Sequence, residues 1–156
     1  MAIAMTVQQY LADHGIEYET VAHPHTESSM ETAESSHLTS HRIAKGVVLK
    51  TEDGYLLAVL PASHHVQLGE LKAWLNQSLG LATEEEIQTL FADCELGAVP
   101  AVGAAYGLNV VMDDALAEEP DVYFEGGDHA TLVHLTAENF RKVLGDVPRA
   151  QFSIES

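Results

Sequence analysis

The chain has 156 residues, 46% of them hydrophobic and 20% charged, which is typical of a single globular domain and excludes a disordered chain. Only 7 Lys or Arg stand against 24 Asp or Glu, and the formal net charge of −17 excludes the broad basic face of a protein that binds DNA or long RNA. No apolar stretch approaches the roughly 18–20 residues that cross a bilayer, and residues 1–10 lack the features of a signal peptide, so we expect one cytoplasmic domain over residues 1–156 without a membrane partner.

The N-terminal part is predicted to contain a helix and a short strand. Residues 6–14 favour a helix, because Thr6 and Gln9 have the spacing of a capping box ahead of an apolar face. Residues 17–21 favour a strand. The polar, histidine- and serine-rich segment that follows offers little core material, and within it only residues 29–36 favour a short helix.

The rest of the chain alternates between strands and helices. Val47–Leu49, the Asp53–Gly54 turn and Tyr55–Leu60 predict a β-hairpin. Apolar residues at helical spacing predict a helix at 68–75, and capping residues Thr83 and Thr136 predict one at 84–92 and one that begins after Thr136. Short apolar runs predict strands at 109–112, 122–124 and 132–135. No internal repeat or linker interrupts this order, so the prediction is a single α/β domain with a mixed sheet.

Several of the few basic residues of the chain are concentrated in one short segment. Arg42, Lys45 and Lys50 are three of the seven basic residues and fall within nine positions. Lys45 opens the apolar run that we predict as a core strand. This local cluster predicts a small site for an anionic ligand, and the alternative is a strand-end lysine whose ammonium group reaches solvent.

Two glycine-containing segments have the composition of ligand-binding loops. Cys94–Gly103 contains Gly97, and Tyr123–His129 contains Gly126 and Gly127. Glycine lets backbone N–H groups approach a ligand closely, and such groups can stabilise the oxyanion formed when water attacks an ester. The alternative is a pair of ordinary turns.

Together these segments resemble the YbaK/prolyl-tRNA editing domain family over residues 17–144. The resemblance rests on segments that occur in order along the chain: Ala44-Lys45-Gly46-Val47-Val48-Leu49, Ala58 to His64, Gly97-Ala98-Val99-Pro100 with Gly103, and Gly126-Gly127-Asp128-His129. It implies a mixed, mostly antiparallel, barrel-like sheet surrounded by helices. It also implies hydrolysis of the ester that joins a wrong, small amino acid to the 3′ end of tRNA.

The same resemblance implies roles for individual residues. Lys45 would be the essential basic residue, Gly97 would supply backbone contacts near the ester, and His129 would line the pocket. The expected substrate-binding residues are Arg42, Gly46, Lys50, Ala98, Pro100, Gly103, Gly126 and Gly127. Many members carry two prolines where this chain has Pro100-Ala101, and a glycine where it has Asp93 or Cys94, so the identity of the amino acid stays open.

The chemistry of the candidate residues narrows their roles. An ammonium group is a poor general base, so we expect Lys45 to contact a phosphate or an oxyanion. His129 could accept a proton from water, but Asp128 could not orient it in an extended segment, because adjacent side chains point to opposite faces. A triad of Ser63, His129 and Asp128 is therefore disfavoured, and backbone groups could hold the water without a protein base.

Metal and cysteine chemistry are weaker alternatives. The pairs His37/His41, His23/His25 and His64/His65 invite a zinc hypothesis, but zinc sites use three or four converging ligands and neither HExxH nor CxxC occurs. Cys94, the single cysteine, could be a nucleophile, although a free cysteine is more often buried packing. We therefore expect no metal and no cofactor.

The predicted function is that of a trans-acting aminoacyl-tRNA deacylase that acts on the acceptor end of mischarged tRNA. The alternative is a non-catalytic module that binds a nucleotide, an aminoacyl-adenosine or a synthetase. A synthetase partner could supply the basic tRNA-binding surface that so acidic a chain lacks.

Overall fold

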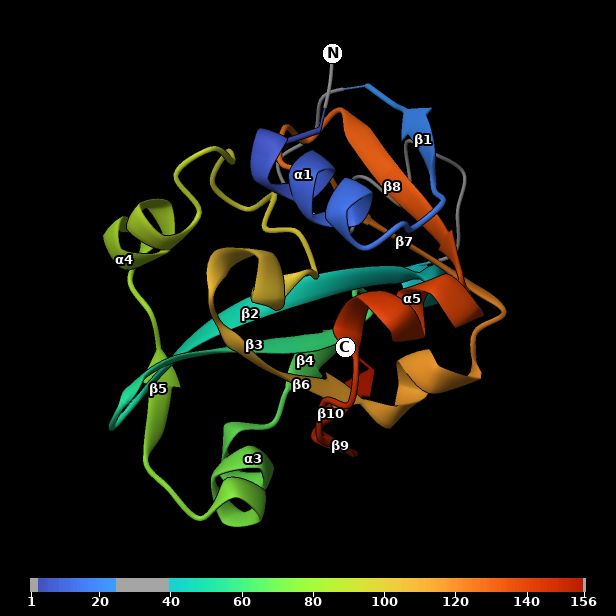
Figure 1. The fold of residues 1–156 in the computed structure, drawn as a ribbon. Helices are drawn as coiled ribbons and strands as arrows, with labels where there is room; N and C mark the ends of the chain where they lie inside the picture. Colours follow the sequence, from blue (N-terminus) through green and yellow to red (C-terminus); the bar gives the residue numbers. More distant parts are fainter. Residues whose placement is uncertain (1–2, 25–39, 156) are drawn as a thin grey trace.

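The computed structural model describes residues 3–24 and 40–155, and its central element is a mixed β-sheet (Figure 1). The strand order is β1-β8-β7-β2-β3-β6-β9, with β5 paired to β2 beside this path and β4 paired to β10 in a small second sheet. The strands are β1 Glu19–Ala22, β2 Ile43–Thr51, β3 Gly54–Pro61, β4 His64–Val66, β5 Leu79–Leu81, β6 Asn109–Asp113, β7 Asp121–Glu125, β8 Thr131–Thr136, β9 Arg149–Ala150 and β10 Ser153–Glu155. Among these strands β2–β7, β3–β6 and β6–β9 pair in parallel and the other pairs are antiparallel, which confirms the predicted mixed sheet.

Helices lie around this sheet. The helices of the described residues are α1 Met5–Asp13, α3 Leu68–Leu75, α4 Glu84–Leu90 and α5 Ala137–Leu144, with short 3-10 turns at Ser40–Arg42, Gly103–Tyr106 and Asp114–Glu118. In Figure 1, α1 and β8 are drawn in the upper part of the view and α3 at its lower end. Within the described part of the chain, no helix has the length and apolar character needed to span a membrane.

Two of the three predicted helix caps are present in the structure. Thr83 and Glu86 form the predicted capping box at α4, and the Thr136 hydroxyl accepts the Asn139 N–H at α5. The capping box predicted at Thr6 is wrong, because α1 begins one residue earlier with Ala4 as its N-cap. The Thr6 N–H instead donates to Oδ2 of Asp93, 87 residues away, at 3.0 Å. The helix predicted at 29–36 lies outside the described residues.

The central strand β2 separates two apolar clusters. Ala44 and Val48 point into the main core, while Leu49 packs in a second cluster on the other face. Because side chains alternate along a strand, Lys45 shares the face of Leu49. Its partner in the β2–β3 hairpin is Leu60, which also belongs to the second cluster. The fold therefore places the Lys45 amine on the face of β2 opposite the main core.

Candidate functional site

Lys45 lies where β2 and β7 stop pairing. The parallel pairs between these strands are Ile43 with Tyr123 and Ala44 with Phe124, so Lys45 and Glu125 are the next residues along each strand. The Lys45 side chain is half-buried, and burial lowers the pKa of its amine. Within residues 3–24 and 40–155, no hydrogen-bond or ion-pair partner holds that amine. A partly desolvated cation without a partner is suited to bind an anion.

The structure does not bring the other two cations of this segment to the Lys45 amine. Arg42 forms an ion pair with Asp121 and lies over the Tyr123 ring at 5.9 Å. Lys50 forms an ion pair with Glu86 at 3.1 Å. Five residues of extended strand, roughly 16 Å, separate Lys50 from Lys45. The expected basic cluster is therefore divided between one unpaired amine and two ion pairs.

The loop that contains Gly97 supplies an unpaired backbone donor. Gly97 is exposed and has φ +85°, in the left-handed region that favours glycine. Its N–H donates to no other group in the described part of the chain, whereas the Ala98 N–H is already hydrogen-bonded to the Glu95 carbonyl. Ala98 and Pro100 are buried below it. Gly97 is thus an exposed residue of this loop that can offer its N–H to a ligand.

The remaining glycines of the prediction serve close packing. A Cβ at Gly46 would lie 2.7 Å from Leu57, and one at Gly103 would lie 2.5 Å from Val110. These glycines let the 97–103 loop pack closely against β2, β3 and β6. This close packing helps to fix the position of the loop relative to β2.

Gly126 and Gly127 pack against the N-terminal segment. A Cβ at Gly126 would lie 2.3 Å from Ile3, and one at Gly127 would lie 3.1 Å from Ala4. The Ala4 N–H also donates to the Gly126 carbonyl at 2.8 Å. The Gly126–Gly127 turn is therefore covered by residues of this chain.

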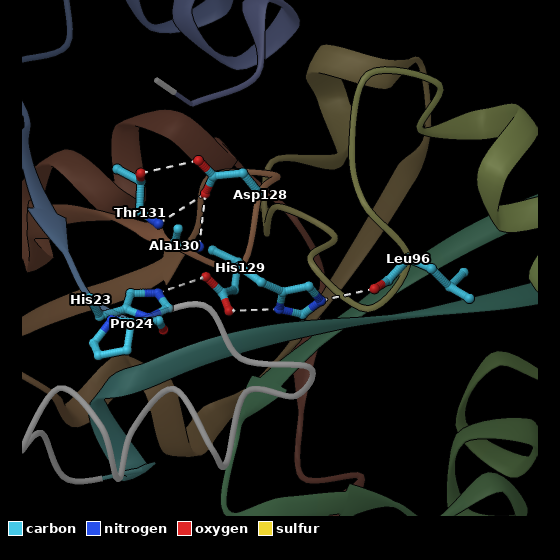
Figure 2. A network of polar contacts seen from close by, with 8 residues as sticks. His23, Pro24, Leu96, Asp128, His129, Ala130 and Thr131 are labelled. Atoms are coloured by element: carbon cyan, nitrogen blue, oxygen red, sulfur yellow. Dashed lines mark hydrogen bonds and ion pairs between the residues drawn. The ribbon is translucent and has the colours of Figure 1, made fainter. Parts of the chain in front are cut away.

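His129 is buried and both of its ring nitrogens are hydrogen-bonded. Nε2 lies 2.8 Å from the Leu96 carbonyl oxygen and Nδ1 lies 3.1 Å from Oε2 of Glu125. Figure 2 shows the ring pointing toward Leu96, with His23 on the other side of the same network. His129 has φ +55°, an uncommon conformation for a residue other than glycine. With both nitrogens engaged, His129 is poorly placed to take a proton from water.

Asp128 does not orient His129, as expected, but the reason differs from the predicted one. The segment is a turn rather than an extended strand. The Asp128 carboxylate accepts the N–H groups of Ala130 and Thr131 at 2.9 and 2.8 Å and so stabilises this turn (Figure 2). The Ser63 hydroxyl lies 3.0 Å from Nδ1 of His41, so Ser63, Asp128 and His129 do not form a triad.

The surroundings of Cys94 disfavour its thiolate form. Burial raises its pKa to about 12, and its sulfur lies 3.3 Å from the Tyr106 hydroxyl. The nucleophile alternative is therefore disfavoured. Among the described residues, no group of three or more His, Cys, Asp or Glu is arranged to hold a metal ion. His25 and His37 lie outside these residues.

A cavity of about 480 Å³ lies elsewhere, beside β3 and β6. Its lining includes Thr51, Tyr55, Val110, Val143 and Pro148 and contains none of the predicted site residues. The candidate site is instead built around Lys45 and the Gly97 loop.

Sequence reasoning missed the polar residues that support this site. In the sequence Glu125 stands out only as part of a glycine-containing segment, although it lies four residues before His129 and is 2% exposed. His23 stands out there only as a possible metal ligand, yet its Nε2 lies 3.3 Å from Oε1 of Glu125. A glutamate that ends an apolar strand is a signal that could have suggested a buried carboxylate.

A family model described as aminoacyl-tRNA editing domain matches residues 23–143, which is most of the chain. The chain belongs to this family. A proline–tRNA ligase of Thermosipho africanus (strain TCF52B) is 33% identical over 87 residues, which cover 55% of this editing domain but 15% of the ligase. The editing domain thus corresponds to a small part of that relative's length.

Solved structures agree with this assignment. A candidate trans-editing enzyme for prolyl tRNA synthetase superposes on the editing domain with a TM-score of 0.84 and 26% identity, covering 96% of this chain and 95% of the other. A scaffold protein used for epitope grafting has a TM-score of 0.85, 24% identity and 97% coverage of both chains, and it supports the fold alone. The predicted family and fold class are therefore confirmed.

Proposed function

We propose that this editing domain is a trans-acting deacylase that hydrolyses the ester of tRNA mischarged with a small amino acid. The observations that carry the proposal are the Lys45 amine, half-buried and without a partner in the described residues, and the exposed Gly97 N–H, whose loop packs through Val99 against Gly46, the residue after Lys45. A cation and a free N–H donor are the two groups that an anionic RNA end and a developing oxyanion require.

The proposed mechanism uses little proton transfer by the protein. An aminoacyl ester is already activated, so positioning and charge stabilisation can supply most of the rate enhancement. Water attacks the ester carbonyl, and the Gly97 N–H stabilises the oxyanion as the C–O bond to the ribose breaks. Lys45 holds the phosphate of the terminal nucleotide. The ribose oxygen takes one proton of the attacking water and leaves as a hydroxyl, and the amino acid is released as a carboxylate while the second proton passes to solvent.

The proposed working environment is the cytoplasm, with mischarged tRNA as substrate. A net charge of −17 repels the body of a tRNA, so we expect contacts to be confined to its acceptor end. A synthetase that presents the tRNA would supply the missing basic surface. The similarity to a proline–tRNA ligase makes tRNAPro the first tRNA to test.

Hydrolysis of a panel of charged tRNAs separates this proposal from a binding-only module. The panel is tRNAPro charged with alanine, serine, cysteine and proline, with and without prolyl-tRNA synthetase. Loss of the ester from at least one mischarged tRNA, faster than from Pro-tRNAPro, supports the deacylase. Saturable binding of a non-hydrolysable aminoacyl-adenosine analogue without turnover of any ester would contradict it and favour the binding module.

A further inference from the structure

Glu125 is a buried carboxylate between two imidazole rings. Its Oε1 lies 3.3 Å from Nε2 of His23, and its Oε2 lies 3.1 Å from Nδ1 of His129. The three side chains are only 1–2% exposed. They come from separate segments: the residue after β1, the end of β7 and the turn before β8. A buried carboxylate requires partners of this kind, because an unpaired charge in the interior is strongly destabilising.

The second nitrogen of each ring faces a backbone carbonyl. Nε2 of His129 lies 2.8 Å from the Leu96 oxygen, and Nδ1 of His23 lies 2.7 Å from the Pro24 oxygen (Figure 2). A carbonyl oxygen only accepts hydrogen bonds, so the nitrogen that faces it carries a proton. This requirement assigns the proton-bearing nitrogen of both rings. His129 donates to Leu96 through Nε2, and its Nδ1 lies within hydrogen-bond distance of Glu125.

The hydrogen bond from His129 sets the orientation of one peptide group. The Leu96 carbonyl and the Gly97 N–H belong to the same peptide, and the described residues contain no cis peptide bond. In a trans peptide the C=O and N–H point in opposite directions. Holding the Leu96 oxygen toward His129 therefore directs the Gly97 N–H away from His129. The positive φ of Gly97 permits this orientation.

We propose that Glu125 is a positioning residue for the deacylation reaction. Through His129 it holds the Leu96–Gly97 peptide with its N–H directed at the oxygen of the ester. This role rests on the proposed function. It assigns Glu125 to the deacylation reaction as a residue that contacts neither the attacking water nor the substrate. Without this restraint the peptide can rotate, and the Gly97 N–H is no longer fixed where the oxyanion forms.

Two substitutions separate positioning from simple structural support. Glu125→Met keeps the length of the side chain but removes its hydrogen bonds, while Glu125→Gln keeps a group that can bond both rings. For Glu125→Met we expect a fall in kcat between about 10- and 100-fold, as for a reacting group displaced by ~1 Å, with KM nearly unchanged. Glu125→Gln should restore most of the wild-type kcat. A Glu125→Met variant with wild-type kcat would overturn the proposal.

His129→Asn tests the next link. Asparagine tolerates the left-handed backbone of this position, but its shorter side chain cannot reach the Leu96 carbonyl. The double variant Glu125→Met/His129→Asn should be no slower than His129→Asn alone, because both act on one peptide. Losses that multiply in the double variant would show that Glu125 does not act through His129.

The Gly97 amide gives a readout that needs no substrate. In 1H–15N spectra of the free protein, its resonance should shift and its hydrogen exchange should accelerate in Glu125→Met and His129→Asn. Asp113→Asn is the matched control, because Asp113 is a buried carboxylate on β6 whose partners, Ala115, Phe152 and Ser153, lie outside this loop. It should lower the melting temperature without moving the Gly97 resonance. An unmoved Gly97 resonance in a folded Glu125→Met protein would overturn the proposal, whether or not the wild type hydrolyses an ester.

Discussion

Lys45 and Glu125 follow the last paired residues of the parallel strands β2 and β7, yet their charged groups form no ion pair. Both carboxylate oxygens of Glu125 instead face imidazole nitrogens, of His23 and His129. Burial lowers the pKa of the Lys45 amine, and no carboxylate of residues 3–24 and 40–155 raises it. The fold thus keeps a carboxylate and an ammonium group apart on neighbouring strands, and the positive charge stays available for a ligand.

Replacing Lys45 should stabilise the protein. A lysine with a lowered pKa binds fewer protons in the folded than in the unfolded state, so it costs stability at neutral pH. The cost disappears as the pH rises through the unfolded-state pKa, near about 10.4. We expect Lys45→Met to raise Tm at pH 7 by on the order of 2 °C, and this difference should shrink toward pH 10.5. A lower Tm at pH 7 would show that the amine has a stabilising partner.

Lys50 should be dispensable for activity. Its amine is paired with Glu86 at the far end of β2, and the Thr83 N–H of the capping box, the Tyr55 hydroxyl and this amine together lower the pKa of Glu86 to about 2. We expect the kcat/KM of Lys50→Ala to match that of the wild type in single-turnover deacylation. A loss as large as that caused by Lys45→Ala would mean that the RNA end reaches along the whole strand.

Cys94 should resist alkylation in the folded protein. With a pKa of about 12, its thiolate fraction at pH 8 is on the order of one part in ten thousand. Iodoacetamide should label the native protein far more slowly than the protein unfolded in urea, as followed by mass spectrometry. Cys94→Ser should keep deacylase activity. Rapid labelling of the native protein, with loss of activity, would make Cys94 a candidate nucleophile again.

Gly103 should be intolerant of a side chain. A Cβ there meets Val110 at 2.5 Å and Leu57 at 3.2 Å, so Gly103→Ala should destabilise the protein by about 1–3 kcal/mol in urea unfolding. Gly69 is the matched control, because it lies in α3 and a Cβ added there would meet no atom within 4 Å. Gly69→Ala should be neutral or stabilising by up to about 1 kcal/mol. Equal stability of the two variants would show that the residues around Gly103 move to accommodate a methyl group at little cost in free energy.

The sequence predicted those elements whose signals are local. Asp53-Gly54 predicted the hairpin of β2 and β3, and Thr83 and Thr136 predicted the starts of α4 and α5. These predictions hold because a turn or a cap depends on residues within four positions of each other. The first helix start was predicted wrongly, because its stabilising partner, Asp93, lies on a distant loop.

The site was only partly predictable for the same reason. The family resemblance implied that Lys45 and Gly97 act together, and the clustering of basic residues in the sequence added Arg42 and Lys50 to them. Their acidic partners come from β7 and α4, which no local pattern connects to β2. The bond between His129 and the Leu96 carbonyl spans 33 residues. The acceptor of this bond is a backbone oxygen, which every residue type has, so the sequence does not indicate the bond.

The Lys45 amine is central to the proposed function, as the cation that holds the RNA end during deacylation. The most direct measurement is single-turnover hydrolysis of mischarged tRNAPro by wild type, Lys45→Ala and the charge-matched control Lys72→Ala, whose lysine is exposed on α3. We expect a fall in kcat/KM of at least about 100-fold for Lys45→Ala, with wild-type activity for Lys72→Ala. Full activity of a folded Lys45→Ala protein, with an ester that the wild type hydrolyses, would contradict the proposed role of this amine.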